Sequence, residues 1–371
     1  MADSFNPSRL ALARRRRGMT MTQLAESVGV DSRSISAYEN GEFQPDGDRL
    51  VELADALDFP LGFFSGDDLE EPAADIASFR ALTKMTSAQR NMALGAGAIA
   101  LHLHRWLEER FELPQPDVPD LSKDADDPEM AAETLRSLWQ LGSLPIKNVV
   151  HLLESKGVRV YTLAIDAKEV DAFSMWHGSM PFIFLNTKKS SERCRFDAAH
   201  ELGHLVLHRH GSPQGPLAEK EANNFASAFL MPRSSVIANA PKLTTIAQLV
   251  ALKKLWTVSV SALAYRLHAL KVLTDWHYRA LCIEMGKRGY QKNEPNSAPR
   301  EVSQLLAKVF AALRKEDVTR SDIARELRIR VGDIDELVFG LTLTTIANQG
   351  PSAKSSVVGA PKLKIVSRDT Q

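Results

Sequence analysis

The sequence has few cysteines, no excess of charge of either sign and no long apolar run, and each absence excludes a class of protein. Two cysteines occur in 371 residues, Cys194 and Cys282, which excludes a disulfide scaffold and a cysteine-rich zinc module. Basic and acidic residues both number 46, so the chain does not coat nucleic acid through its overall charge. Any contact with DNA therefore needs a local patch.

Membrane-spanning and secretory features are also missing. The longest apolar stretch, about residues 92–103, is too short to cross a bilayer and is interrupted by His102. The opening MADSFNPSRL has no apolar core of a signal peptide. Hydrophobic residues make up 44% of the chain and charged residues 25%, which is typical of a soluble globular protein. We therefore expect a cytoplasmic protein without a membrane partner.

Shifts in composition predict a multidomain, mainly α-helical protein. A chain of 371 residues is expected to hold two or three domains. Residues that favour strands concentrate in three short runs, which predict a small strand group with one hairpin: 158–163, 172–176 and 182–185. The predicted segments are a bundle of short helices (7–64), a linker (65–75), a helical connecting or sensor region (76–156), an α+β domain (157–273), a helical region (274–345) and a flexible tail (346–371).

The first bundle contains the pattern of a helix-turn-helix. Gly29 lies between a helix that ends near Val28 and one that starts near Ser32, where a tight corner needs a residue that tolerates positive φ. Asp31 or Ser32 can cap the second helix. Apolar residues at helical spacing on both sides could close a small core.

The segment TQLAESVGVDSRSISAYENG resembles the phage-repressor (Xre-type) helix-turn-helix family. This resemblance implies a five-helix domain that binds a double-stranded DNA operator as a homodimer, with residues 32–38 as the recognition helix. Ser32, Arg33 and Ser36 would face base edges, whereas Asn40 and Gln23 would contact phosphate. Arg33 is the best candidate to bind a guanine, because its fork matches O6 and N7.

Charge argues against a simple DNA-binding domain. Residues 1–64 contain 7 Arg and no Lys but 10 acidic residues, and the positive charge is concentrated in residues 14–17. These arginines could steer the domain toward the DNA backbone. The alternative is a helix-turn-helix used for protein contact or dimerisation.

The segment CRFDAAHELGHLVLHRHG carries the most informative motif, HExxH. His200 and His204 lie one turn apart on the same face of a helix, so their imidazoles can converge on one metal ion. Glu201 is adjacent and can act as a general base on water and then as an acid toward a leaving amine. Both histidines fall in a mostly apolar helix, where unpaired imidazoles would cost free energy.

A catalytic zinc site of this kind needs a third protein ligand. His208 is too far along a continuous helix from His200, at about 12 Å, to share an ion with both histidines. A carboxylate in LAEKEANNFASAFLMP is the better candidate, and Glu221 is preferred over Glu219 because it starts the apolar face of the next helix. Asn224, one turn further on, could support a ligand.

The segments RFDAAHELGHLVLH and EKEANNFASAFLMP together resemble the ImmA/IrrE family of metallopeptidases. With the helix-turn-helix in front, the chain resembles the transcriptional-regulator branch of that family. The resemblance covers about residues 157–273 and implies a minimal zincin-like fold, with zinc (or manganese) held by His200, His204 and Glu221 and with Glu201 catalytic. It also implies that the substrate is a repressor protein, itself a helix-turn-helix protein, whose cleavage derepresses genes for stress response or mobile-element transfer.

Several alternatives stay open at this point. A non-proteolytic repressor, whose metal domain is a sensor or a structural module, could act in a toxin–antitoxin or phage-defence locus. The intact Glu201 favours an enzyme, because a structural site needs no general base. The strand at 182–186 could offer an edge to an extended substrate. The donor that polarises the scissile carbonyl could be His208, Tyr265, Arg266 or His268.

The C-terminal helices carry a second pattern. Residues 318–341 also have the spacing of a helix-turn-helix, although a bundle that makes protein contacts is the preferred interpretation.

Overall fold

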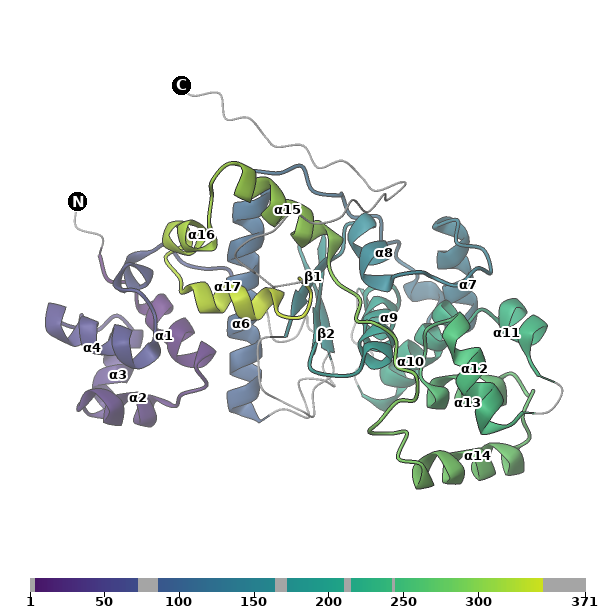
Figure 1. The fold of residues 1–371 in the computed structure, drawn as a ribbon. Helices are drawn as coiled ribbons and strands as arrows, with labels where there is room; N and C mark the ends of the chain where they lie inside the picture. Colours follow the sequence, from purple (N-terminus) through teal and green to yellow (C-terminus); the bar gives the residue numbers. More distant parts are fainter. Residues whose placement is uncertain (1–3, 73–85, 164–171, 210–214, 242–243, 343–371) are drawn as a thin grey trace.

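The structure is a computed structural model that describes residues 4–72, 86–163, 172–209, 215–241 and 244–342. Figure 1 shows an elongated arrangement, with the N-terminal helices at one end, a small sheet in the middle and a second group of helices at the other end. The mainly helical class predicted from the sequence is confirmed. The predicted tail, 346–371, lies outside the described residues.

The N-terminal bundle consists of four α-helices and a 3-10 turn: α1 Pro7–Arg16, α2 Met21–Val28, α3 Ser32–Glu39, α4 Gly47–Leu57 and η1 Leu61–Ser65. Gly29 ends α2 with a φ of 67°, the left-handed conformation that the corner requires. Asp31 then caps α3 by accepting a hydrogen bond from the backbone N–H of Arg33 at 2.8 Å. The helix-turn-helix follows from these two local features.

The predicted connecting region is divided between two sides of the molecule. Its elements are α6 Ser87–Glu108, η2 Ser122–Asp124, α7 Pro128–Leu138 and α8 Val149–Ser155. Helix α6 packs against α1, whereas α7 packs against α10 and α8 against α9 and β1 (Figure 1). Among these four elements, α6 is the one that packs against the N-terminal bundle.

The sheet has three strands in the order β1-β3-β2: β1 Arg159–Thr162, β2 Ala172–His177 and β3 Met180–Leu185. Strand β3 pairs in parallel with β1 and antiparallel with β2. The prediction of a free edge at 182–186 is therefore wrong over the strand itself. The physical reason is that 182–185 is apolar on both faces and fully buried, which suits a central strand.

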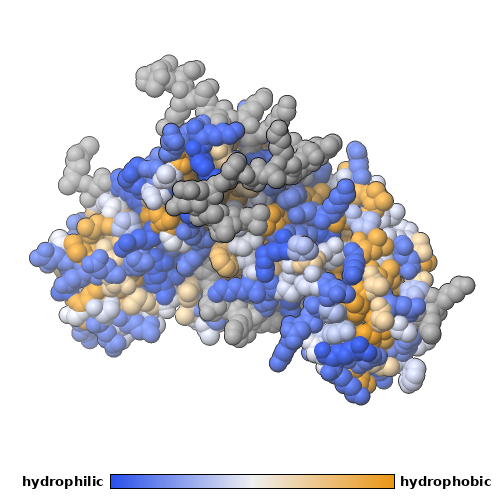
Figure 2. Space-filling model, in the orientation of Figure 1, coloured by the Kyte–Doolittle hydropathy of each residue, from blue (hydrophilic) through white to orange (hydrophobic). Residues whose placement is uncertain are grey.

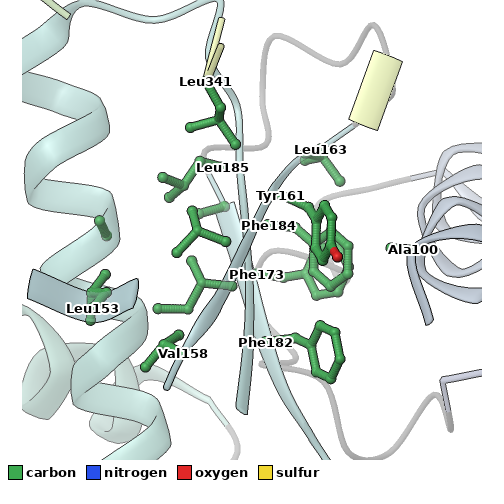
Figure 3. Close-up of a cluster of buried hydrophobic side chains, with 14 of the residues drawn as sticks. Ala100, Leu153, Val158, Tyr161, Leu163, Phe173, Phe182, Phe184, Leu185 and Leu341 are labelled. Atoms are coloured by element: carbon green, nitrogen blue, oxygen red, sulfur yellow. The ribbon is translucent and has the colours of Figure 1, made fainter. Parts of the chain in front are cut away.

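Each face of the sheet is covered by a helix. Helix α9 packs against β2 and β3 on one face. On the other face, Figure 3 shows an aromatic group beside Ala100 of α6. The rings of Phe173 and Phe184 stack there with centroids 4.4 Å apart. The sheet therefore lies between α9 on one face and α6 on the other.

The second group of helices begins with α9 and lies at the end of the molecule away from the N-terminal bundle (Figure 1). The elements are α9 Ser191–Leu207, α10 Pro216–Leu230, α11 Arg233–Asn239, α12 Ile246–Leu252, η3 Lys253–Leu255, α13 Val260–Ala269 and α14 Asp275–Lys287. Apolar surface is visible over this end of the molecule in Figure 2. Trp276 and Ile283 of α14 contribute to the exposed apolar residues, at 79% and 60% exposure.

The C-terminal helices return to the N-terminal bundle. They are α15 Gln304–Lys315, α16 Arg320–Leu327 and α17 Val331–Val338. One side of α17 is buried against α6 and β1. Asp333 of α17 accepts hydrogen bonds from Arg17, the residue that follows α1, at 2.9 and 3.2 Å. Because the buried side of this helix is used for contacts within the chain, the structure favours protein contact over a second DNA-binding unit.

Within the described ranges, no single helix is both long and apolar enough to cross a membrane. One pair, Ile246–Leu255 with Val260–Ala269, passes the same length and composition test but is bent by 95°.

Candidate metal centre and DNA-binding surface

Helix α9 brings the two motif histidines together. His200 Nε2 and His204 Nε2 lie 3.1 Å apart, as one helical turn between them predicts. Glu219 of α10 completes the group, with Oε2 3.6 Å from His200 Nε2 and Oε1 3.5 Å from His204 Nε2. The three ligand atoms all lie within 4.8 Å of one another.

The carboxylate beside the histidines is Glu219, whereas the sequence favoured Glu221. The two residues are about 200° apart around the axis of α10. Glu219 faces the middle of α9, where the histidine pair lies. Glu221 faces the end of α9, where its Oε2 is 2.9 Å from His208 Nε2. Both carboxylates flank the contact between the helices, and only the packing of α10 on α9 distinguishes them.

The supporting amide is likewise Asn223 and not Asn224. Asn223 Oδ1 lies 3.1 Å from His200 Nδ1. A carbonyl oxygen can only accept, so His200 carries its proton on Nδ1 and presents the lone pair of Nε2 to the ligand group. Asn223 lies one turn after Glu219, on the same face of α10. Asn224 lines the adjacent cleft.

The spacing of the group fits a small divalent cation. Ligand atoms about 2.1 Å from a tetrahedral zinc ion lie about 3.4 Å from one another. The three measured separations, 3.1, 3.5 and 3.6 Å, are close to that edge length. Two imidazole nitrogens and a carboxylate are also the donor set of a catalytic zinc site with an open position. The residues present therefore fit the metal.

Glu201 lies on the side of α9 that faces the sheet. Its Oε2 accepts a hydrogen bond of 2.6 Å from Ser174 Oγ of β2, and the residue is 3% exposed. The sequence analysis missed Ser174. The signal was the alternation in β2, where Phe173 and Met175 point to one face and Ser174 to the other. A short hydrogen bond to one oxygen orients this carboxylate.

The group lies at a cleft of about 1240 Å³ formed by α9, α10, α13 and residues 290–294. Among the four candidates for a carbonyl-polarising donor, Tyr265 lines this cleft and is 44% exposed. The other three have partners: Arg266 binds Glu129 at 2.8 Å, His268 binds Asp275 at 2.7 Å, and His208 lies between His204 and Glu221.

Burial, and next the neighbouring His204, lower the pKa of His208 below its usual value.

The predicted DNA-contacting residues all lie on α2, on α3 or at the end of α3. Arg33 and Asn40 are exposed, and Ser32 and Ser36 are half-buried on α3. Gln23 is exposed at the start of α2, where its Oε1 accepts from the backbone N–H of Thr20 at 2.8 Å. These five side chains are therefore at least partly exposed to solvent. Contact of each of them with DNA stays a prediction.

Four consecutive arginines, 14–17, lie at the end of α1 and directly after it. Each makes an ion pair with an acidic residue of the same chain: Arg14 with Glu39, Arg15 with Glu71, Arg16 with Glu336 and Arg17 with Asp333. These pairings reduce the charge available to attract phosphate, and steering of the domain by these arginines stays a prediction. Their positive charges are paired with carboxylates of the same chain. The basic residue that the recognition helix α3 itself carries is Arg33.

Comparisons with known proteins agree with this geometry. Residues 10–64 match the family described as helix-turn-helix, and residues 153–268 match the peptidase family described as IrrE N-terminal-like domain. A similar protein is the cryptic phage CTXphi transcriptional repressor RstR of Vibrio cholerae, 36% identical over 58 residues. That match covers 16% of this chain and 52% of the repressor, so the chain spans about half of this relative.

A helix-turn-helix match implies DNA binding, and the IrrE-like match adds a peptidase-type domain whose family is typically metal-dependent. The chain therefore joins a helix-turn-helix DNA-binding domain, residues 10–64, to a domain of the ImmA/IrrE-like peptidase family, residues 153–268.

Proposed function

We propose that this protein is a DNA-binding transcriptional regulator that carries a zinc-dependent endopeptidase, and that it cleaves a helix-turn-helix repressor protein. Such cleavage would derepress genes of a stress response or of a mobile element. One observation carries the proposal: His200, His204 and Glu219 meet within 4.8 Å, at the wall of a large cleft and beside Glu201. A structural metal site needs neither the cleft nor the adjacent carboxylate.

Each residue has a distinct part in the reaction. His200, His204 and Glu219 would hold the ion, which supplies a Lewis acid when bound. Glu201 takes a proton from the attacking water as the new C–O bond forms, and gives it to the amine nitrogen as the C–N bond breaks. Ser174 keeps Glu201 oriented through its 2.6 Å hydrogen bond. Tyr265, exposed in the cleft, is the donor we assign to the carbonyl oxygen.

The helix-turn-helix would place this activity at an operator. One recognition helix contacts one half-site, so a homodimer with two half-sites about 34 Å apart is the expected binding unit. Arg33 is the residue we assign to a base edge, because it is exposed on α3 while arginines 14–17 are paired within the chain.

Metal content tests the site directly. Elemental mass spectrometry of the purified protein should find about one zinc ion per chain, with manganese measured in the same run. His204→Ala should lose the ion, because the two remaining ligands, His200 and Glu219, would bind it only weakly. His277→Ala, a histidine on α14 outside the cleft lining, is the matched control and should retain it. A wild-type protein that binds no divalent ion after reconstitution would remove the peptidase assignment.

Glu201→Gln then separates enzyme from sensor. The substitution removes the base but keeps its size, so metal content and operator binding should match the wild type while repressor cleavage falls by at least about 100-fold. If gene regulation in cells survives this change unaltered, the protein acts without proteolysis and its metal domain is a sensor or a structural module.

A further inference from the structure

His208 and Glu221 form a hydrogen-bonded chain that ends on a ligand of the proposed metal site. His204 Nδ1 lies 2.9 Å from His208 Nδ1, and His208 Nε2 lies 2.9 Å from Glu221 Oε2. His208 is the residue at which α9 ends, and Glu221 is on α10. The chain therefore joins the two helices that supply the ligand group.

Glu221, the carboxylate at the end of this chain, determines which nitrogen donates and which accepts in each hydrogen bond. A carboxylate only accepts, so His208 must donate from Nε2 and its neutral ring then offers Nδ1 as an acceptor. His204 must in turn donate from Nδ1. That leaves the lone pair of His204 Nε2 directed toward His200 Nε2, 3.1 Å away, and Glu219. The chain thus selects the tautomer of His204 that can bind a cation.

Burial makes this selection effective. The side chains of His208 and Glu221 are 7% and 10% exposed. Water therefore competes little for their hydrogen bonds, and a buried carboxylate without this partner would cost free energy. His200 receives the equivalent support from Asn223, a neutral group. The two histidines are thus supported differently, one by an amide and one by a buried carboxylate acting through a third imidazole.

We propose that His208 and Glu221 are positioning residues that hold His204 in its metal-binding tautomer and orientation. This inference rests on the proposed function, because it assumes that His204 is a ligand. It also gives Glu221 a definite part in the site although Glu219 is the carboxylate next to the histidines. A carboxylate that acts through an imidazole raises the basicity of the ligand, so its loss should weaken metal binding without abolishing it.

Zinc affinity of the full-length protein, measured by competition with a chromophoric chelator, tests the proposal. His208→Phe and Glu221→Ala should each weaken binding about 10- to 100-fold while one zinc ion per chain still binds. Glu221→Gln keeps an acceptor at the same place, so its affinity should lie between those of Glu221→Ala and the wild type. Asn224→Ala, one turn further along α10 in the cleft lining, is the control and should bind like the wild type. Thermal melting of the metal-free proteins reports any loss of fold.

The double variant His208→Phe with Glu221→Ala separates a connected chain from two independent effects. Because both residues act through His204, the double variant should be about as weak as the weaker single variant. Multiplication of the two losses would overturn the proposal, and so would wild-type affinity in both single variants. Loss of stoichiometric zinc in Glu221→Gln, with zinc retained in Glu219→Gln, would make Glu221 the ligand. Absence of zinc binding in the wild type would overturn the proposed function as well.

Discussion

At the scale of single residues, Glu154 is a carboxyl group that folding has buried. It ends up 4% exposed at the end of α8. It accepts hydrogen bonds from the Ser303 hydroxyl and from the backbone N–H groups of Gln304, at 2.9 Å, and Leu305, at 3.0 Å. These donors favour the charged form, but burial outweighs them and raises the pKa of Glu154 to about 7.

Stability should therefore depend on pH through this group. The pKa of Glu154 is 4.5 for the free side chain and about 7 in the fold, so the folded state holds an extra proton between these values. The free energy of unfolding should fall as pH rises from 4.5 to 7, by up to about 3 kcal/mol, and then level off. Urea unfolding of wild type and Glu154→Gln at pH 5, 6, 7 and 8 isolates the effect. The variant should gain on the wild type with rising pH, whereas a constant difference would mean that Glu154 does not titrate in this range.

The sequence alone predicted only part of the proposed metal site. HExxH spacing brings His200 and His204 together in any continuous helix, so that pair was accessible from the sequence. The third carboxylate was not, because Glu219 and Glu221 both flank the apolar face of α10. The contact between α9 and α10 decides which one meets the histidines. Ser174 could have been identified from the sequence, because it is a polar residue between the apolar residues Phe173 and Met175.

At the scale of elements, the approach of α9 to α10 depends on Gly203. A Cβ atom at this position would lie 3.0 Å from a ring carbon of Phe225 and 3.3 Å from Ala222 Cα. Phe225 is fully buried and Ala222 contributes backbone, so neither can move freely. The absence of a side chain at 203 thus allows α10 to bring Glu219 next to the histidines.

Gly203→Val should consequently weaken both the fold and the site. Overpacking is expected to cost about 1–3 kcal/mol of unfolding free energy, and the displaced α10 should lower zinc affinity. Gly286→Val is the matched control, because Gly286 is also helical but has open space around its Cα. Denaturant unfolding and zinc competition should show a loss in the first variant and little change in the second. Equal behaviour of the two would contradict close packing at Gly203.

The order of the strands in the sheet could not be predicted from local sequence patterns. The three strands and their hairpin are predictable from β-branched and aromatic runs, but β1 pairs with β3 although β2 lies between them in sequence. Such a crossover is set by packing against α9 and α6 and by no short motif. The four apolar residues at 182–185 did carry a signal, since a run that is apolar on both faces indicates a central strand.

At the scale of the whole molecule, the C-terminal helices connect the DNA-binding bundle to the sheet. Asp333 of α17 is 2% exposed and contacts both Arg16, the last residue of α1, and Arg17, which follows it. Just after α17, the carbonyl oxygen of Phe339 accepts hydrogen bonds from the Thr162 and Thr187 hydroxyls at 2.6 and 2.9 Å. One short helix is therefore bonded to the bundle on one side and to residues at the ends of β1 and β3 on the other.

Removal of Asp333 should loosen this connection. Asp333→Ala leaves the buried guanidinium of Arg16 with less compensation, and breaking a buried pair of this kind costs about 3–5 kcal/mol. We expect the bundle to unfold separately, as an added low-temperature transition in calorimetry with faster amide exchange in α1. Asp335→Ala is the control, because Asp335 pairs with Arg320 at 42% and 30% exposure and such surface pairs contribute at most about 1 kcal/mol. A single transition at the wild-type temperature in Asp333→Ala would mean that α6 alone joins the bundle to the sheet. With the expected result, α17 becomes the element through which events at the cleft and at the operator can affect each other.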